Sequence, residues 1–257
     1  MDVTNRFVLD FARQFAISLP GARILDFGCG AGALVAAGRA AGLDMLGADV
    51  FFHGSPGTRE EAERAGLLKT AIHEIRDGRL DFEDGAFDLV TNNQVMEHVE
   101  DLDATLGELH RVLKRDGVLL SIFPSRDVFR EGHIGIPFSH WFAKGSKPRF
   151  YYTWALRSLG LGTWKEQAPT RRQWAADKLG WIDAYSHYRP KREIFLAFDR
   201  YFTTEMREPD YIRFRLKDTP ALASMARLLD LPGAPAMASA VFRRLAFMVL
   251  VSRRRER

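Results

Sequence analysis

The amino-acid sequence predicts an α/β fold built around a mostly parallel sheet, and three observations carry this prediction. Over the first 123 residues, short apolar runs alternate with segments of helical periodicity, as repeated strand–helix–strand units do. A glycine-rich loop follows directly on the first of these runs. The chain has 257 residues, of which 46% are hydrophobic and 27% charged. These values fit one large globular domain, or a medium domain that carries an insertion.

The predicted elements of the first half follow in order. Apolar residues at helical spacing over residues 5–19 predict an amphipathic first helix, and Pro20-Gly21 marks the turn after it. Short apolar runs predict five strands, at residues 23–27, 44–48, 71–75, 87–91 and 118–123. Helices are expected between them, at residues 33–41, at 58–66 and from Leu102 to a last turn that contains Lys114 and Arg115.

The stretch from residue 124 to residue 192 differs in composition from the rest of the chain. It holds thirteen Lys and Arg against five Asp and Glu, a local charge of +8, whereas the remaining residues carry −4. It also contains all five tryptophans, which are Trp141, Trp154, Trp164, Trp174 and Trp181. We therefore divide the chain into a first part (1–124), an insertion that forms a substrate lid (125–192) and a closing part (193–257). The alternative is that the tryptophans form the insertion's own core and the charges its solvated face.

The closing part is expected to complete the same sheet. Helical spacing predicts helices at residues 193–202 and 221–229, and the apolar run at 247–251 predicts the last strand. Apolar and basic residues alternate over 211–216, which predicts a half-exposed strand. The basic tail at residues 253–257 is expected to be solvated and loosely ordered, with peripheral membrane contact as the lesser alternative.

Composition also limits the compartment and the cofactors. The longest apolar run near either end, residues 245–251, is far too short to cross a bilayer. A single cysteine, Cys29, excludes a disulfide framework and a cysteine-rich metal site. The first residues show no basic segment leading into an apolar one, so we expect no export signal and a cytoplasmic location. No histidine or acid spacing is typical of zinc or iron, so no metal is expected.

The glycine-rich loop at residues 28–32 has two interpretations. As G-x-G-x-x-A it suits a dinucleotide. As D-x-G-x-G-x-G, with Asp26 two residues before the first glycine, it suits a ligand with a cationic group near the loop. Asp49 ends the second strand, where an acid can accept two hydrogen bonds from ribose hydroxyls. The two acids indicate a nucleoside ligand and leave both NAD and another adenosine cofactor open.

Four segments, in order along the chain, carry a family resemblance. They are ILDFGCGAG (residues 24–32), LDFEDGAFDLV (80–90), MEHVED (96–101) and LHRVLK (109–114). Together they resemble the class I S-adenosylmethionine-dependent methyltransferases, in the small-molecule branch often called type 11. The resemblance covers residues 20–124 and the closing elements near residues 221–251. It implies a Rossmann-like seven-stranded sheet of order 3-2-1-4-5-7-6, in which the last hairpin is antiparallel, with the aromatic, basic insertion after strand 5.

The resemblance also implies roles for individual positions. The positions of Asp26 and of the loop glycines would hold the methionine part of S-adenosylmethionine, and that of Asp49 its ribose. Val50 or Phe51 would flank the adenine, and Asp77 is the candidate for its acidic contact. The end of the fourth strand would lie beside the reactive methyl group. The full set of expected cofactor-binding residues is Asp26, Gly28, Cys29, Gly30, Gly32, Asp49, Val50, Asp77 and Asn92.

The implied reaction is methyl transfer to an oxygen, amine or activated carbon of a small acceptor. A base is needed only where the nucleophile begins protonated, as a hydroxyl does. The candidate bases are His98, His133 and His140. The last two are preferred because their segment follows the carboxyl end of the fifth strand, where α/β sheets place their substrates.

The insertion indicates the chemistry of the acceptor. Its aromatic residues can stack on a ring, and its charge of +8 favours an anionic or sugar-containing molecule, such as a phosphorylated or lipid-linked sugar. Three other functions stay open. They are an RNA methyltransferase, although no RNA-binding module is recognisable, an NAD-dependent oxidoreductase, and a non-catalytic methyltransferase-like binding subunit.

Overall fold

The computed structural model describes residues 1–255, and a seven-stranded sheet of order β3-β2-β1-β4-β5-β7-β6 runs through it. The parallel strands are β1 (Arg23–Phe27), β2 (Asp44–Asp49), β3 (Ile72–Glu74), β4 (Phe87–Asn93) and β5 (Leu113–Phe123). β7 (Met248–Arg254) runs antiparallel to both β5 and β6 (Phe202–Met206). The predicted strand order and the antiparallel last hairpin are confirmed.

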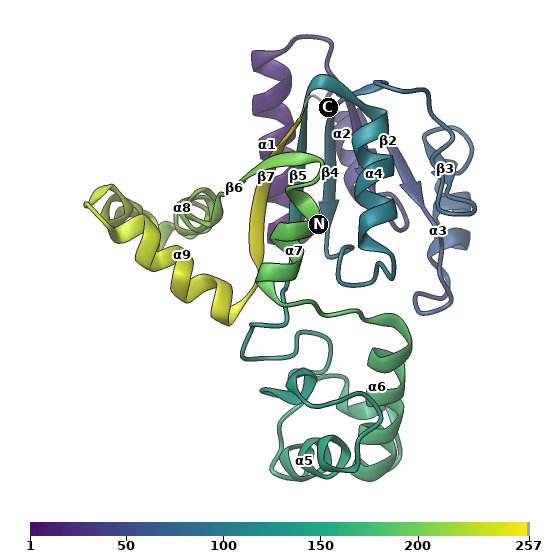
Figure 1. Cartoon of the computed structure of the whole chain (residues 1–257), viewed down its shortest axis with the longest axis vertical. Helices are drawn as coiled ribbons and strands as arrows, with labels where there is room; N and C mark the ends of the chain where they lie inside the picture. The colour runs from purple at the N-terminus through teal and green to yellow at the C-terminus, as the bar shows by residue number, and fades with distance from the viewer. Residues whose placement is uncertain (256–257) are drawn as a thin grey trace.

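Helices cover both faces of this sheet (Figure 1). α1 (Val3–Ser18) and α2 (Ala33–Ala40) pack on one face, and α4 (Leu102–Val112) and α7 (Lys191–Phe198) pack on the other. α3 (Thr58–Arg64) lies near β3 at the sheet edge. Successive strand residues point to opposite faces of the sheet. Ile24 therefore packs in the apolar cluster under α1 and α2, and Leu25 packs in the cluster under α4 and α7. Both faces of the sheet are therefore buried, as parallel sheets require.

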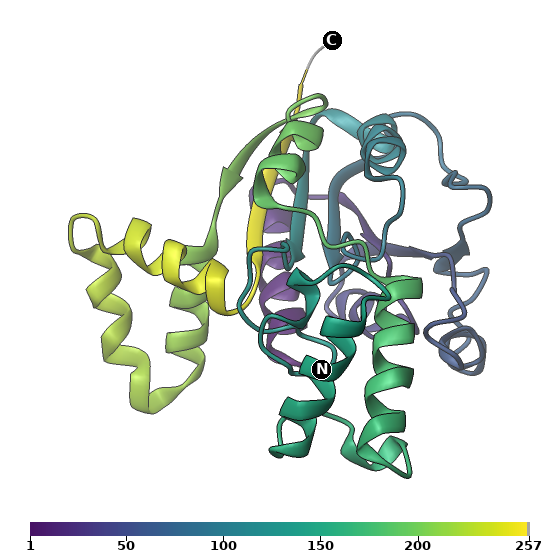
Figure 2. The same cartoon turned by 60° about the horizontal axis from the view of Figure 1, so that its bottom comes forward.

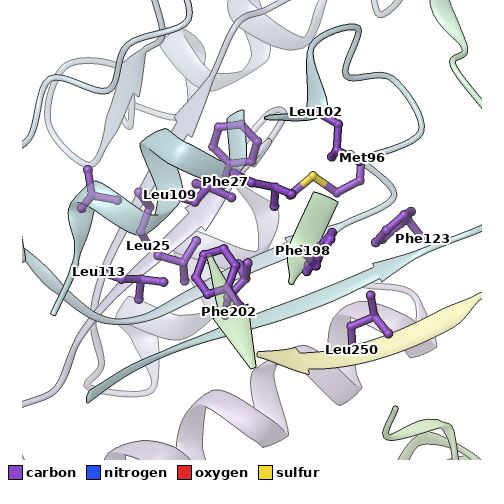
Figure 3. Close-up of a cluster of buried hydrophobic side chains, with 14 of the residues drawn as sticks. Leu25, Phe27, Met96, Leu102, Leu109, Leu113, Phe123, Phe198, Phe202 and Leu250 are labelled. Carbon is purple, nitrogen blue, oxygen red and sulfur yellow. The ribbon is translucent and has the colours of Figure 1, made fainter. Parts of the chain in front are cut away.

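The loop after β4 is held in place by one core side chain. Met96 is 1% exposed and packs in the same cluster as Leu102 and Phe198, as Figure 3 shows. Because a buried methionine fixes the path of the backbone around it, the neighbouring residues Glu97 and His98 have defined positions beyond the end of the strand.

The insertion lies beyond one end of the sheet (Figure 1). It contains α5 (Lys147–Ser158), α6 (Arg171–Tyr185) and two short 3₁₀ helices (Ser139–Trp141 and Lys165–Gln167). Trp174 is fully buried at the centre of an apolar cluster of its own, with Ile134, Ile136, Leu179 and Ile182. The other tryptophans are not in the buried core of this cluster, and Trp164 is 59% exposed.

The closing part departs from the prediction at residues 211–216, which are helical rather than extended. They belong to α8 (Glu208–Asp218), in which Pro209 stands in the first turn, where a proline favours a helix start. Tyr211 and Phe214 are one helical turn apart, and both rings contact Phe7 of α1, at centroid distances of 5.2 and 5.5 Å. Packing at i, i+3 thus outweighed the alternation of apolar and basic residues.

Other boundaries of the closing part also differ from the expectation. The sheet gains β6 at the end of the predicted 193–202 helix, and residues 220–230 form a 3₁₀ helix, η3 (Pro220–Asp230). The unpredicted α9 (Ala234–Leu245) follows it and, with α8 and η3, projects from the side of the sheet (Figures 1 and 2).

Two basic segments were placed wrongly. Lys114 and Arg115 lie in β5 rather than in the last turn of α4, and Lys114 Nζ forms an ion pair with Asp88 at 2.8 Å. Arg253 and Arg254 of the expected loose tail are part of β7. Residues 256–257 lie outside the described residues. Among residues 1–255, we find no helix with the length and apolar character that a bilayer crossing requires.

Candidate functional site

A cavity of about 680 Å³ opens where the carboxyl ends of β1, β2 and β4 meet. This is the edge at which open α/β sheets bind their ligands, and the volume lies within the range of small-molecule sites. Its walls come from the glycine loop, the end of β2, the loop after β4, the first turns of α4, and α6 of the insertion. Lining residues that matter below are Gly28, Gly30, Asp49, Val50, Phe52, Gln94, His98, His133, Trp181 and Tyr185.

The glycine loop is tied to β2 through its backbone. The amides of Gly28 and Cys29 both donate to the carbonyl of Ala48, at 2.7 and 3.3 Å. Gly28 has a φ of +75°, and a Cβ there would lie 2.3 Å from a methyl carbon of Val95. Only glycine fits this position, so the backbone can line the cavity without a side chain in the way.

The thiol of Cys29 is packed against β2. A Cβ on Gly47 of β2 would lie 2.6 Å from Cys29 Sγ, so the thiol packs against that strand. Burial raises the pKa of the Cys29 thiol well above its usual range, and the nearby Asp26 and Asp49 raise it further. The thiol therefore stays protonated, and it is not among the groups that line the cavity.

Asp26 is a buried acid next to the loop. It is 5% exposed, and its Oδ1 accepts a hydrogen bond from Thr91 Oγ1 at 3.0 Å. Burial raises the pKa of Asp26 to about 7, with Thr91 lowering and Asp49 raising it. Among residues 1–255, no group donates to its Oδ2. A cationic ligand group would supply the missing partner, but Asp26 itself is not part of the cavity wall, which its neighbours Phe27 and Gly28 line.

Asp49 joins the loop to the end of β2. Its Oδ2 accepts from the Gly30 amide and its Oδ1 from the Phe51 amide, each at 2.7 Å. A carboxylate has about four acceptor sites, so two remain for ribose hydroxyls in the cavity that Asp49 lines. The neighbouring Val50 is 53% exposed and lines the same cavity, as an adenine contact would require.

The remaining predicted cofactor residues, Gly32, Asp77 and Asn92, do not themselves line the cavity. Gly32 is the N-cap of α2. Asp77 is exposed on a turn whose neighbours Ile75 and Gly78 line the cavity. Asn92 is fully buried, with its Nδ2 donating to Ser121 Oγ at 2.8 Å, and is absent from the cavity wall. Gln94, two residues later with a φ of +58°, lines the cavity instead.

Two of the three predicted histidines meet in the cavity. The Nε2 atoms of His98 and His133 are 3.3 Å apart, and both residues line the cavity. His98 Nδ1 contacts the carbonyl oxygen of Tyr185 at 2.6 Å, and His133 Nδ1 contacts Glu131 Oε1 at 2.7 Å. Since both partners are acceptors, each Nδ1 donates, and each Nε2 is directed at the other.

The surroundings of the pair shift the pKa values of the two imidazoles in opposite directions. Burial lowers the pKa of His98, against the hydrogen bond to Tyr185. Burial also opposes the charged form of His133, but the contact with Glu131 outweighs it and raises the pKa. The same contact, with a hydrogen bond from Tyr188, holds the pKa of buried Glu131 below its ordinary value. Glu131 therefore fixes the ring orientation of His133 and favours its charged form.

Glu97 is the third member of this group. It is 2% exposed, and neither carboxylate oxygen has a hydrogen-bond partner within residues 1–255. Burial raises its pKa to about 8. One oxygen of Glu97 and one nitrogen each of His98 and His133 all lie within 4.8 Å of one another. The sequence did not reveal this group, because two of its members are adjacent and the third is 35 positions away.

His140 lies elsewhere. It is 6% exposed in the 3₁₀ helix Ser139–Trp141, with Nε2 on the carbonyl oxygen of Arg126 at 3.1 Å. Burial lowers its pKa. The ring packs against Tyr188 and is not part of the cavity wall. This position does not favour His140 as a base.

Comparisons with known proteins find a matching family model, related sequences and a similar fold. The chain matches the family described as "Methyltransferase domain" over residues 4–187. It is 33% identical over 119 residues to a ubiquinone biosynthesis O-methyltransferase of Actinobacillus pleuropneumoniae serotype 7, covering 45% of this chain and 51% of the relative. A protein of the same name from Cereibacter sphaeroides is 31% identical over 149 residues, covering 56% and 60%. The match thus spans between half and two thirds of the length of these relatives.

Among solved structures, an S-adenosylmethionine-dependent methyltransferase from Mesorhizobium loti superposes with a TM-score of 0.54 at 21% identity. The superposition covers 96% of this chain and all of that protein. At this identity the likeness establishes the fold, which is the one predicted from the sequence.

Proposed function

Because this chain belongs to the methyltransferase family, within the class I S-adenosylmethionine-dependent enzymes, we propose that it methylates a hydroxyl oxygen of a small aromatic acceptor. One observation carries the proposal. A pair of imidazoles opens on the same cavity as the glycine loop and Asp49. Only an acceptor that begins protonated, as a hydroxyl does, requires such groups.

The cofactor residues fit S-adenosylmethionine. Asp26, next in sequence to the cavity residues Phe27 and Gly28, has an oxygen without a donor for the ammonium. Asp49 has two free acceptor sites for the ribose, and Val50 has an apolar surface for the adenine. When bound, S-adenosylmethionine supplies a methyl group on a positively charged sulfur, and an oxygen nucleophile takes this group as S-adenosylhomocysteine leaves. The chain's own task is then to position the acceptor and to remove its proton.

The histidine pair is the group that receives the hydroxyl. As the new C–O bond forms, the acceptor oxygen loses its proton, and His98, whose pKa is lowered by burial, is the member of the pair with an unprotonated Nε2 that can accept it. Glu131 holds His133 in orientation, and the Tyr185 carbonyl oxygen does the same for His98. Both imidazoles are therefore fixed before the acceptor arrives.

The cavity wall favours an aromatic acceptor over an anionic one. Phe52 and Tyr185 lie 5.5 Å apart between ring centroids, and Trp181 lies 5.6 Å from Tyr185, so the wall can stack on a planar ring. The charged residues of the wall are acids, namely Asp49, Glu100, Asp101 and Glu108. No Lys or Arg of the insertion appears in that wall.

Three basic residues of the insertion make contacts within the protein instead. Arg149, 2% exposed, forms an ion pair with Asp183, and Lys144 Nζ donates to the carbonyl oxygens of Asp183 and Ser186 at 2.8 and 2.7 Å. Arg189 donates to the carbonyl oxygen of Val99 at 2.9 Å, which ties the insertion to the loop after β4. We propose that the insertion serves as the lid of the acceptor site. The names of the two curated relatives, both O-methyltransferases, support oxygen as the acceptor atom.

Calorimetry and a transfer assay test the proposal together. We expect S-adenosylmethionine and S-adenosylhomocysteine to bind and NADH not to bind. Asp26→Ala and Asp49→Ala should each weaken that binding by about 10- to 100-fold, the loss of one or two charge-assisted contacts. Asp116→Ala, at an exposed position on β5, is the matched control.

The acceptor is tested with radiolabelled methyl groups and two panels. One contains hydroxylated aromatic compounds and the other phosphorylated sugars. We expect label in the first panel only, and His133→Ala should lower the transfer rate while the affinity for S-adenosylhomocysteine stays unchanged. Label in the phosphorylated sugars alone would overturn the acceptor class, and equal binding of NADH would overturn the ligand placement.

A further inference from the structure

We propose that Glu97, His98 and His133 bind a divalent metal ion of the zinc type at the acceptor end of the cavity. Metal binding stands on the geometry of these three side chains. Its use, to activate the acceptor hydroxyl, rests on the proposed function.

The protonation pattern of the two imidazoles leaves a site between them. Each Nδ1 donates to an oxygen, His98 to Tyr185 and His133 to Glu131. When both imidazoles are neutral, each carries its one proton on Nδ1, so each Nε2 presents a lone pair, and the two Nε2 atoms are 3.3 Å apart. Such a contact is stable only with a cation between them, either a proton or a metal ion.

The distance between the nitrogens fits a metal. Zinc binds imidazole at about 2.0–2.1 Å, so two nitrogens of a tetrahedral site are separated by about 3.3–3.4 Å. The observed separation is 3.3 Å. Octahedral coordination at the same bond length would place adjacent nitrogens about 2.9 Å apart, which fits less well.

Glu97 is an independent observation that points to the same ligand. It is 2% exposed, yet neither of its oxygens has a partner among the described residues. A buried carboxylate without partners costs free energy that a bound cation would offset. Its nearest oxygen lies within 4.8 Å of both imidazole nitrogens, so an approach of at most about 1.5 Å completes a three-ligand site.

The surroundings of the ligands also have the character of a metal site. Imidazoles that bind metals commonly donate their other N–H to a carboxylate or a backbone carbonyl, and this site has one of each, from Glu131 and Tyr185. Two imidazoles and one carboxylate favour zinc, iron or cobalt over magnesium, which prefers oxygen ligands alone.

Three protein ligands leave a fourth position for another molecule. Because His98 and His133 line the cavity, that position faces the acceptor. A hydroxyl oxygen that coordinates there loses its proton to water at a lower pH than it would in solution, and the oxygen is then ready to form the bond to the methyl carbon.

Cobalt and zinc are the probes for the first test. The full chain is stripped with a chelator, titrated with Co²⁺ without cofactor, and followed by visible absorption, with Zn²⁺ as the competitor. We expect one equivalent to bind, with the intense bands of tetrahedral cobalt. Glu97→Gln, His98→Ala and His133→Ala should each weaken binding by more than about 100-fold, and Glu131→Gln by about 10- to 100-fold. His53→Ala, at an exposed histidine, is the control that should bind normally.

Absence of saturable Co²⁺ binding would overturn the proposal, and so would unchanged affinity in both His98→Ala and His133→Ala. Glu97→Gln keeps the size of the side chain, so it remains informative if a histidine variant does not fold. Circular dichroism identifies such a variant.

A second measurement separates this proposal from the proposed function. Methyl transfer to hydroxylated aromatics that continues unchanged in chelated protein, with no cobalt bound, would overturn the metal and leave the function. Cobalt bound by these three residues, with label only in phosphorylated sugars, would support the metal and overturn the acceptor.

Discussion

His98 and His133 face each other at 3.3 Å between their Nε2 atoms, although one follows β4 and the other belongs to the insertion. Arg189 and the backbone contact of His187 with the carbonyl oxygen of Glu97 tie the two segments together. Through His133, the insertion therefore lines the cavity beside His98. Variants that loosen it should change acceptor chemistry more than cofactor binding.

Asp26 makes cofactor binding depend on pH. Burial raises its pKa to about 7, so near neutrality half of the free protein carries the neutral acid. A bound ammonium favours the carboxylate, and binding must then release a proton below pH 7. We expect the affinity for S-adenosylhomocysteine to fall up to tenfold per pH unit between about pH 7 and 5.5. Calorimetry across this range measures it.

Two variants sharpen that measurement. Thr91 Oγ1 donates to Asp26 and lowers its pKa, so Thr91→Val should move the midpoint of the affinity profile to higher pH. Asp26→Asn should give weaker binding without this pH dependence. A flat profile in the wild-type protein would show that Asp26 does not meet the ammonium.

The same acid should reduce stability. Its pKa in the folded protein lies above the ordinary value of 3.8, so folding favours the neutral form, and ionisation destabilises the fold as pH rises from about 4 to 7. Asp26→Asn should therefore raise the free energy of unfolding at pH 8, by on the order of 2–4 kcal/mol, and have little effect near pH 4. Denaturant titrations at the two pH values measure both. A loss of stability at pH 8 would contradict the prediction.

Gly28 tests the close approach of the glycine loop to Val95, in the loop after β4. Gly28→Ala places a Cβ 2.3 Å from Val95 at a φ of +75°, so we expect about 2–4 kcal/mol of destabilisation from overpacking and left-handed backbone together. Gly21→Ala has a φ of +79° with no atom within 4 Å, and should cost only about 1–2 kcal/mol. Thermal unfolding compares the two. Equal losses would mean that Val95 yields to the added methyl group.

The sequence predicted the sheet well because its cues are local. The motif around Asp26 and the apolar runs of β1, β2 and β4 each lie within a few residues, and family motifs fixed their order. Residues 211–216 were assigned wrongly because Tyr211 and Phe214 contact Phe7, some 200 positions away, and alternation alone does not show this contact.

The reactive end of the site was only half predictable for the same reason. His98 and His133 were singled out as histidines near strand ends. Nothing in the local sequence placed them in contact, however, or brought Glu131 within hydrogen-bond distance of Tyr188, 57 positions later. Glu97 looked like part of a family motif, and its lack of partners appears only once the fold has buried it.

Trp174 tests whether the insertion is held by a core of its own. The side chain is fully buried, and its Nε1 donates to the carbonyl oxygens of Thr163 and Trp164, both at 3.1 Å. Trp174→Ala removes the centre of a small cluster, so we expect about 3–5 kcal/mol of destabilisation. Trp164→Ala, at a ring that is 59% exposed, should cost less than about 1 kcal/mol. Hydrogen exchange locates the loss: α6 should lose protection in Trp174→Ala while β1 and β4 keep theirs, and S-adenosylhomocysteine should still bind. Loss of protection throughout the sheet would show instead that the insertion and the sheet unfold as one unit.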